Sequence, residues 1–274
     1  MLTRSIIKIP LFLLGLIAWL NASAHDPIFG KGPHVLFKGG VEVSPQIDFS
    51  KANNNKELSW GLNLTYGITG DWAAGIELPY LDKENLFSSS SGTGDVKLFT
   101  KFRFWRNDSL GVQESAAVLL KVKLDNADTN TTPSLGSGAT SSILGLAYGY
   151  ESSKWYRWAS VRYAINGENN TGLRRGDKIF VDFAGGVRLK MNDYEKPDTV
   201  WMIELNGELT QRNEFNGSKL ANTGGDQWFI SPGIFWTKRN FAIKAGIQIP
   251  ISSSLNGNQD EVDYRAKLVF EWHL

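Results

Sequence analysis

Every second side chain is apolar along the C-terminal segment Asp263–Leu274. Successive side chains of an extended strand point to opposite faces, so these apolar residues would share one face. They are Tyr264, Ala266, Leu268, Phe270, Trp272 and Leu274, and the opposite row carries Arg265, Lys267, Glu271 and His273. An apolar, aromatic outside and a charged inside are typical of a strand in a closed sheet that is surrounded by lipid.

The same period of two recurs along the chain and predicts an all-β fold, a transmembrane antiparallel β-barrel of 12 strands. Each segment has about the 9–11 residues that cross a bilayer at a tilt. The predicted strands are Val41–Ser50, Leu58–Thr69, Trp72–Leu81, Asp95–Trp105, Val112–Leu124, Ser142–Tyr150, Tyr156–Ile165, Ile179–Lys190, Val200–Thr210, Trp228–Thr237, Phe241–Ile251 and Asp263–Leu274.

Short and long connections alternate between these strands. Gly70-Asp71 is a tight turn, for example, whereas Asp125–Ser141 is long and rich in Asn, Ser and Gly. A barrel with both termini in the periplasm has short periplasmic turns and longer outer loops. We therefore predict periplasmic N and C termini. A soluble β-sandwich needs no such alternation.

Aromatic residues lie near both ends of the predicted lipid-facing rows, where amphipathic rings occupy the two surfaces of a bilayer. The predicted outer girdle contains Trp60, Tyr80, Tyr163, Trp228 and Tyr264. The predicted periplasmic girdle contains Tyr66, Trp72, Phe104, Tyr150, Trp201, Trp236 and Trp272.

The first residues have the pattern of an export signal. Arg4 and Lys8 precede an apolar stretch that is too short to span a membrane, and Ala22-Ser23-Ala24 is a small-x-small cleavage site. We expect residues 1–24 to be a signal peptide, residues 25–40 an N-terminal periplasmic segment or plug, and residues 41–274 the barrel. The balance of 29 basic and 28 acidic residues gives no support for nucleic-acid binding.

The strand at the C-terminus must pair with the first strand, because closure removes both edges of the sheet. Pro45 lies at this seam, and its missing N–H is expected to weaken the ladder there. Trp272 and Leu274 resemble the C-terminal signal that is read by the barrel-assembly machinery, although such signals usually end in phenylalanine. The expected partners are therefore outer-membrane lipid and that machinery.

Charged side chains on the inward rows are the candidate lumen-lining residues. The basic ones are Lys97, Lys101, Arg103, Lys121, Lys123, Arg162, Arg188, Lys244, Arg265 and Lys267, and the acidic ones include Glu77, Asp182, Glu204 and Glu208. Two interpretations remain open. The charges could form a salt-bridge network that fills the lumen, or the basic residues could line a path for anionic solutes.

Four segments resemble an outer-membrane, transporter-like family labelled "putative MetA-pathway of phenol degradation". They are YGITGDWAAGIELPYL (Tyr66–Leu81), GTGDVKLFTKFRFW (Gly92–Trp105), SPGIFW (Ser231–Trp236) and GIQIPI (Gly246–Ile251). The chain departs from the family at Asp125-Asn126-Ala127, where a Pro-Thr-Gly-like turn is usual. The resemblance implies a barrel that admits small, often aromatic or apolar, compounds, and it carries no catalytic site.

Histidines are few, which argues against a barrel hydrolase. Such an enzyme needs a nucleophile beside a base, and only His25, His34 and His273 are present. We predict no enzymatic activity and no cofactor. After cleavage, His25 could chelate copper through its amine and imidazole nitrogens, with His34 nearby, or it could simply begin an exported tail.

These patterns together predict a bacterial outer-membrane channel, porin-like or transporter-like, for passive or gated passage of small solutes, with aromatic and anionic compounds as candidates. The alternative is a non-conducting outer-membrane barrel that acts as a surface, assembly or copper-associated binding protein.

Overall fold

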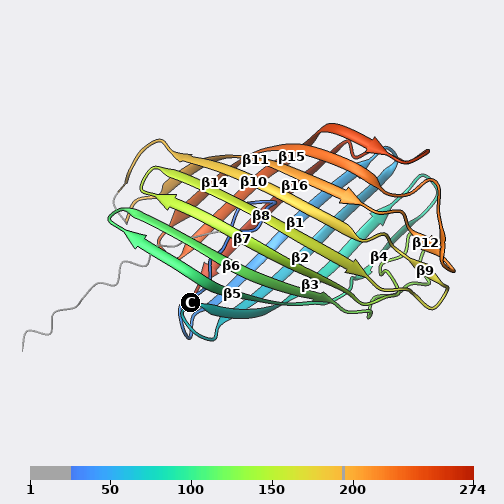
Figure 1. Cartoon of the computed structure of the whole chain (residues 1–274), viewed down its shortest axis with the longest axis horizontal. Helices are drawn as coiled ribbons and strands as arrows, with labels where there is room; N and C mark the ends of the chain where they lie inside the picture. Colours follow the sequence, from blue (N-terminus) through green and yellow to red (C-terminus); the bar gives the residue numbers. More distant parts are fainter. Residues whose placement is uncertain (1–25, 193–194) are drawn as a thin grey trace, which may run out of the picture.

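Twelve long antiparallel strands close into one barrel (Figure 1). The computed structural model describes residues 26–192 and 195–274, so the predicted signal peptide and His25 lie outside the described residues. The barrel strands are β1 (Val41–Ala52), β2 (Asn55–Gly67), β3 (Trp72–Glu84), β5 (Lys97–Ser109), β6 (Val112–Lys123), β7 (Ser141–Ser152), β8 (Trp155–Asn166), β10 (Lys178–Arg188), β11 (Asp198–Thr210), β14 (Gly225–Lys238), β15 (Phe241–Leu255) and β16 (Tyr264–His273).

The predicted fold class is confirmed, with each predicted strand found at its place and with boundaries that differ by a few residues. Four short strands were not predicted: β4 (Ser89–Thr93), β9 (Leu173–Arg174), β12 (Glu214–Phe215) and β13 (Ser218–Lys219). They lie in the long loops, and β4 extends the sheet by pairing with the end of β3. Their polar residues show no alternation, because neither face is covered by lipid or by a core.

The barrel closes where β1 pairs with β16, and this seam carries a gap. Val43 pairs with Trp272 and Gln46 with Val269, but no pair forms at Ser44 or Pro45. On its other edge Pro45 pairs normally with Leu62 of β2. Proline has no N–H to donate, so the ladder is interrupted on one side only. The predicted weakness of the seam at Pro45 is confirmed.

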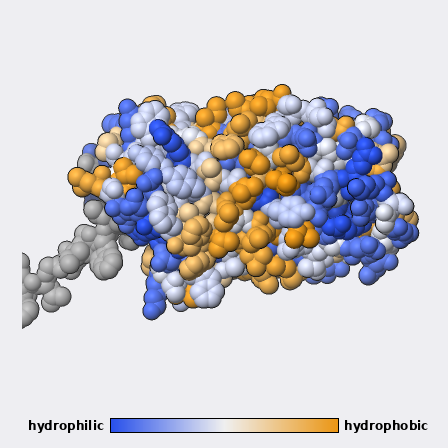
Figure 2. Space-filling view, viewed as in Figure 1, coloured by the Kyte–Doolittle hydropathy of each residue, from blue (hydrophilic) through white to orange (hydrophobic). Residues whose placement is uncertain are grey.

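An apolar band crosses the middle of the visible face of the barrel, between two more hydrophilic ends (Figure 2). Leu146 at the centre of β7 is 53% exposed, and its neighbour Ala147 points inward and is 4% exposed. The aromatic residues predicted at the strand ends, such as Trp60 and Trp201, are also exposed on this outer surface. This surface suits lipid, and the inward rows are therefore free to carry charge.

The connections after β2, β5, β7, β10 and β14 lie at one end of the barrel, here called the short-turn end, and the other connections lie at the opposite, long-loop end (Figure 1). Two connections depart from the predicted alternation in length: residues 189–197 form a long connection at the short-turn end, and Asn53-Asn54 form a tight turn at the long-loop end. Leu274 exchanges two main-chain hydrogen bonds with Val41 at the short-turn end. The periplasmic location of this end remains a prediction. No helix among the described residues is long and apolar enough to cross a membrane.

Candidate functional site: the barrel lumen and the segment inside it

Residues 26–36, here called the lumen segment, precede β1 and lie inside the barrel. Their main-chain N–H groups have no strand partner, and Glu204 of β11 supplies one. The carboxylate accepts hydrogen bonds from the N–H groups of Ile28 at 2.6 Å and Gly30 at 2.8 Å, and from that of Phe29 at 3.2 Å. Glu204 is 1% exposed. A buried carboxylate and three unpaired N–H groups satisfy one another, which makes Glu204 an anchor for the segment.

Apolar packing holds the same residues against the wall. Ile28 is buried in a cluster of inward-facing side chains from β8, β10, β11, β14 and β15. The cluster contains Trp158, Ala184, Val200, Met202, Phe235 and Ala242. The lumen segment covers these inward positions, so they can be apolar without facing water. Full burial of an isoleucine side chain contributes about 2 kcal/mol.

Two paired glycines provide the space for Ile28. Gly233 of β14 lies opposite Gly246 of β15 in the ladder. A Cβ atom on Gly233 would lie 2.2 Å from Cδ1 of Ile28, and one on Gly246 would lie 3.2 Å from the same atom. These glycines belong to the SPGIFW and GIQIPI motifs, so the motifs shape the wall on which the lumen segment rests.

Asp26 forms an ionic contact with the opposite wall. Its two carboxylate oxygens lie 2.8 and 2.9 Å from Nζ of Lys101 on β5, and Nζ of Lys244 donates to its main-chain oxygen at 3.3 Å. Burial by itself would raise the pKa of Asp26. The charges of Lys101, Lys31 and Lys244 outweigh burial and hold that pKa below its usual value. The segment therefore bridges two sides of the barrel.

The far end of the lumen segment reaches the short-turn end of the barrel. The ring of His34 contacts the carboxylate of Glu151, which also accepts a hydrogen bond from Nε1 of Trp158 at 2.7 Å. The N–H of Gly39 then donates to the carbonyl of Gly67 at 2.8 Å, just before β1 begins. The segment thus runs from the middle of the lumen to this end and turns back into the wall.

Metal ligands are scarce among the described residues. The suitable atoms of Glu42, Glu271 and His273 lie within 4.8 Å of one another. Glu271 already pairs with Lys244, and His273 lies 2.8 Å from Glu42, so each member of the group already has a partner in the barrel. The copper hypothesis for His25 and His34 remains a prediction, since His25 lies outside the described part of the chain.

A cavity of about 470 Å³ remains beside the lumen segment, mainly on the side of β16, β1, β2, β3, β5 and β6. Its lining includes Glu42 and Thr65 near the short-turn end and Asp48 and Glu57 nearer the long-loop end. The segment therefore leaves a polar space along one wall of the barrel while it covers the other wall.

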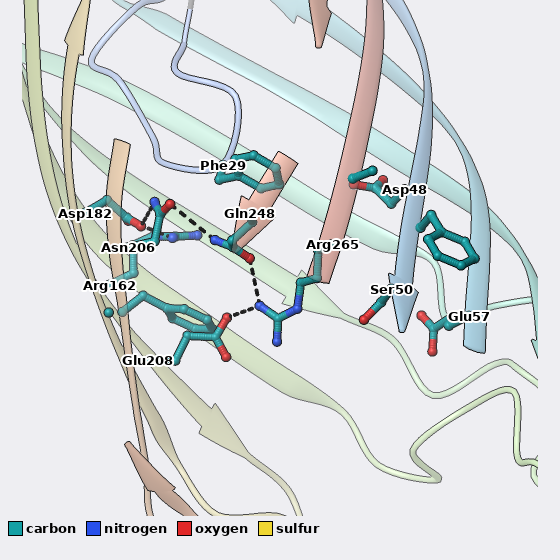
Figure 3. A pocket seen from close by; sticks show the side chains of 14 residues that line it. Phe29, Asp48, Ser50, Glu57, Arg162, Asp182, Asn206, Glu208, Gln248 and Arg265 are labelled. Carbon is teal, nitrogen blue, oxygen red and sulfur yellow. Dashed lines mark hydrogen bonds and ion pairs between the residues drawn. The ribbon is translucent and has the colours of Figure 1, made fainter. Parts of the chain in front are cut away.

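A second cavity of about 200 Å³ lies toward the long-loop end (Figure 3). Phe29 of the lumen segment lines both cavities, as do Asp48, Glu57 and Arg162, so the two spaces adjoin at the tip of the segment.

A chain of hydrogen bonds connects the smaller cavity with the anchor Glu204, and Figure 3 shows its part from Arg265 to Asn206. Arg265 donates to Glu208 at 2.6 Å and to Gln248 at 3.0 Å. Gln248 donates to Asn206 at 3.2 Å, and Asn206 donates to Glu204 at 3.4 Å. The position of Glu204 is therefore coupled to side chains that line the cavity.

Ten of the fourteen predicted lumen residues line one of the two cavities: Lys97, Lys101, Lys121, Arg162, Lys244, Arg265, Lys267, Glu77, Asp182 and Glu208. Four do not. Glu204 holds the lumen segment, and the other three form ion pairs elsewhere: Arg103 with Asp71, Lys123 with Asp95 and Arg188 with Asp198.

Each of the ten predicted basic residues has a carboxylate partner. Lys97 and Lys121 share Glu77 at 2.5 and 2.8 Å. Arg162 pairs with Asp182 at 2.7 Å. Such pairs favour the interpretation of a salt-bridge network for much of the wall. They also leave polar, water-compatible surfaces around the cavities, so both interpretations retain support.

Sequence reasoning did not identify several residues that shape the lumen, among them Asp26, Lys31, Glu151 and Trp158. The apolar residues of the segment suggested a plug, but they gave no signal for the wall residues that would hold it. Those partners lie between 75 and 218 positions away in the sequence, and only barrel closure brings them together.

Comparisons with known proteins agree with the fold. A family model described as "Putative MetA-pathway of phenol degradation" matches residues 77–255. The COG4313 outer membrane channel from Pseudomonas putida F1 is 13% identical and superposes with a TM-score of 0.70, covering 92% of this chain and 100% of that one. The NanC porin is 11% identical with a TM-score of 0.52, covering 85% and 100%. A search of curated proteins gave no significant match.

Proposed function

Because the chain belongs to the family described as "Putative MetA-pathway of phenol degradation" and is a channel-like barrel of the bacterial outer membrane, we propose that it conducts small solutes along a path narrowed by its lumen segment. The cavity of about 470 Å³ carries this proposal. It follows the wall from the short-turn end toward the long-loop end, beside the lumen segment, and most of its lining is polar.

The way the segment is held favours a gated path over a permanently open pore. Residues 26–36 form no strand and add nothing to the barrel ladder. Their attachment depends on side chains: Glu204, Lys101 and the apolar cluster around Ile28. Each hydrogen bond to a charged group contributes about 1.5–3 kcal/mol, so local release requires far less free energy than opening the barrel.

Apolar groups in the path support a solute with an apolar part. Phe29, Phe99 and Leu119 line the larger cavity among its charged residues. The family description refers to phenol degradation, and the COG4313 protein is named as a channel. Small aromatic compounds are therefore the first solutes to test. The proposal assigns the protein no catalytic step.

A reversible cross-link tests whether the segment restricts conduction. The chain contains no cysteine, so an Ile28→Cys/Gly233→Cys double variant has a single possible disulfide. We expect planar-bilayer conductance to be low when this variant is oxidised and to rise after reduction. The two single-cysteine variants are the controls and should not respond to the reductant.

Deletion of residues 26–35 provides an independent measurement. Its conductance and its liposome swelling with phenol, sugars and organic anions should exceed those of the unmodified protein. Equal, low conductance in the deletion variant, the reduced variant and the unmodified protein would contradict the proposal. It would instead favour the non-conducting barrel.

A further inference from the structure

Lys31 differs from the other cations of the lumen. It follows Gly30, which is fixed by Glu204, and it lines the larger cavity. Within residues 26–192 and 195–274, its ammonium group has neither a hydrogen bond nor an ion pair. An ammonium group without a protein partner in a partly buried cavity contributes no stabilising ion pair to the fold. Its three N–H donors and its charge therefore remain available to bind a ligand.

Cations from three separate wall strands line the same cavity as Lys31. Burial lowers the pKa of Lys31 to about 7, and the charges of Lys121 on β6, Lys267 on β16 and Arg162 on β8 act in the same direction. Asp26 acts in the opposite direction. The lumen segment thus places one more positive charge where positive charges already meet.

The carboxylates of this region do not balance its cations. Around Lys31, six cations face four carboxylates: Lys31, Lys97, Lys101, Lys121, Arg162 and Lys267 against Asp26, Glu77, Asp48 and Asp182. The other acidic residues of the cavity lining pair with other groups: Glu271 with Lys244, Glu57 with Lys83, and Glu42 with His273. An excess of positive charge therefore remains in the middle of the path.

Apolar surface lies directly beside this positive centre. Nζ of Lys121 is 5.8 Å from the centre of the Phe99 ring, and Phe29 and Leu119 also line the cavity. Ammonium and guanidinium groups bind carboxylates well, and aromatic rings pack favourably against one another. A fully inorganic anion would leave the apolar surface unused.

We propose that the lumen holds a binding subsite for a small aromatic carboxylate, with the carboxylate at Lys31, Lys121, Lys267 and Arg162 and the ring against Phe99. The inference rests on the proposed conduit, because it names the class of solute that this conduit accepts. Bound carboxylate would hold Lys31 protonated. Affinity therefore falls as the pH rises above about 7, where unliganded Lys31 loses its proton.

Benzoate is the probe, and equilibrium dialysis against the purified full-length barrel in detergent micelles is the measurement. We expect benzoate to bind more tightly at pH 6 than at pH 8, and the uncharged isostere benzamide to bind at least about tenfold more weakly. Lys31→Met should weaken benzoate binding by about tenfold, the value of one charge-assisted hydrogen bond. Lys31→Arg should retain binding and lose most of the pH dependence, since arginine stays charged.

Lys38→Met is the matched control, because Lys38 is exposed outside the cavity on the same stretch of chain. Heat-modifiability on gels establishes that each variant is folded. Benzoate binding that is unchanged in Lys31→Met, or equal binding of benzamide and benzoate, would overturn the inference.

Dialysis does not depend on conduction, so the two proposals can fail separately. A conducting barrel that fails to bind benzoate retains the proposed function and loses the subsite. A barrel that binds benzoate but stays silent in bilayers, even without residues 26–35, keeps the subsite and loses the conduit.

Discussion

Ile28 occupies the space that the missing side chain of Gly233 leaves on the barrel wall: a Cβ atom there would lie 2.2 Å from Cδ1 of Ile28. Atoms cannot approach so closely, so a methyl group must displace the isoleucine. Sequence position alone gives no hint of this contact, which joins residues more than 200 positions apart.

Gly233→Ala should therefore loosen the lumen segment and raise single-channel conductance. Gly185→Ala is the matched control, since a Cβ atom at Gly185 of β10 would meet nothing within 4 Å. In an Ile28→Ala background the effect of Gly233→Ala should become smaller, because the clashing atoms are gone. An equal effect in both backgrounds would show that the glycine acts through the wall itself.

Glu204→Gln should also release the segment. An amide oxygen accepts the N–H groups of Ile28 and Gly30 more weakly than a carboxylate does, at an expected loss of about 1–3 kcal/mol of anchoring. Limited proteolysis of the lumen segment should be faster in this variant. Glu168→Gln, in an exposed loop position, is the control and should leave the rate unchanged. Equal protection of both variants would exclude Glu204 as the anchor.

The contact between Asp26 and Lys101 should persist down to low pH. The pKa of Asp26 is lowered in the folded protein, so its ionic contribution is fully present above the usual value of 3.8 and is lost as the pH falls below it. Lys101, Lys244 and Lys31 are the charged groups that face it, and they remain protonated at such pH.

Asp26→Asn should therefore show faster proteolysis of the lumen segment than the unmodified protein throughout pH 5–6. The difference should shrink only as the pH approaches and passes below 3.8. A difference that already disappears near pH 5 would show that Asp26 has a raised pKa and no stable contact with Lys101.

A charge on the outer surface should reveal the position of the bilayer. Leu146 lies at the centre of β7 within the apolar band, and Leu146→Arg should destabilise the folded barrel in liposomes by about 2–4 kcal/mol. Leu110, in the turn after β5, is fully exposed beyond the band, so Leu110→Arg should cost less than about 1 kcal/mol. Denaturant unfolding in liposomes measures both, and equal effects would place the band outside the lipid.

The sequence by itself determined the barrel. Each transmembrane strand must present alternate residues to lipid and to the interior. Its period of two is therefore a local property of the sequence, which can be recognised without knowledge of the tertiary contacts. The segment Leu58–Thr69 shows this most clearly. Pro45 likewise predicted the gap in the pairing of β1 with β16, because proline lacks an N–H whatever its surroundings are.

Only the tertiary structure decided how the lumen is arranged. The sequence supplied charged inward residues and an apolar segment before the first strand, but it could not say that Glu204 holds Ile28 while Lys31 stays unpaired. Those relationships depend on which strands face each other across the lumen after the barrel closes, and on how deeply the lumen segment extends into the barrel. The physical reason is that lipid acts on every strand separately, whereas contacts across the lumen exist only once all strands are in place.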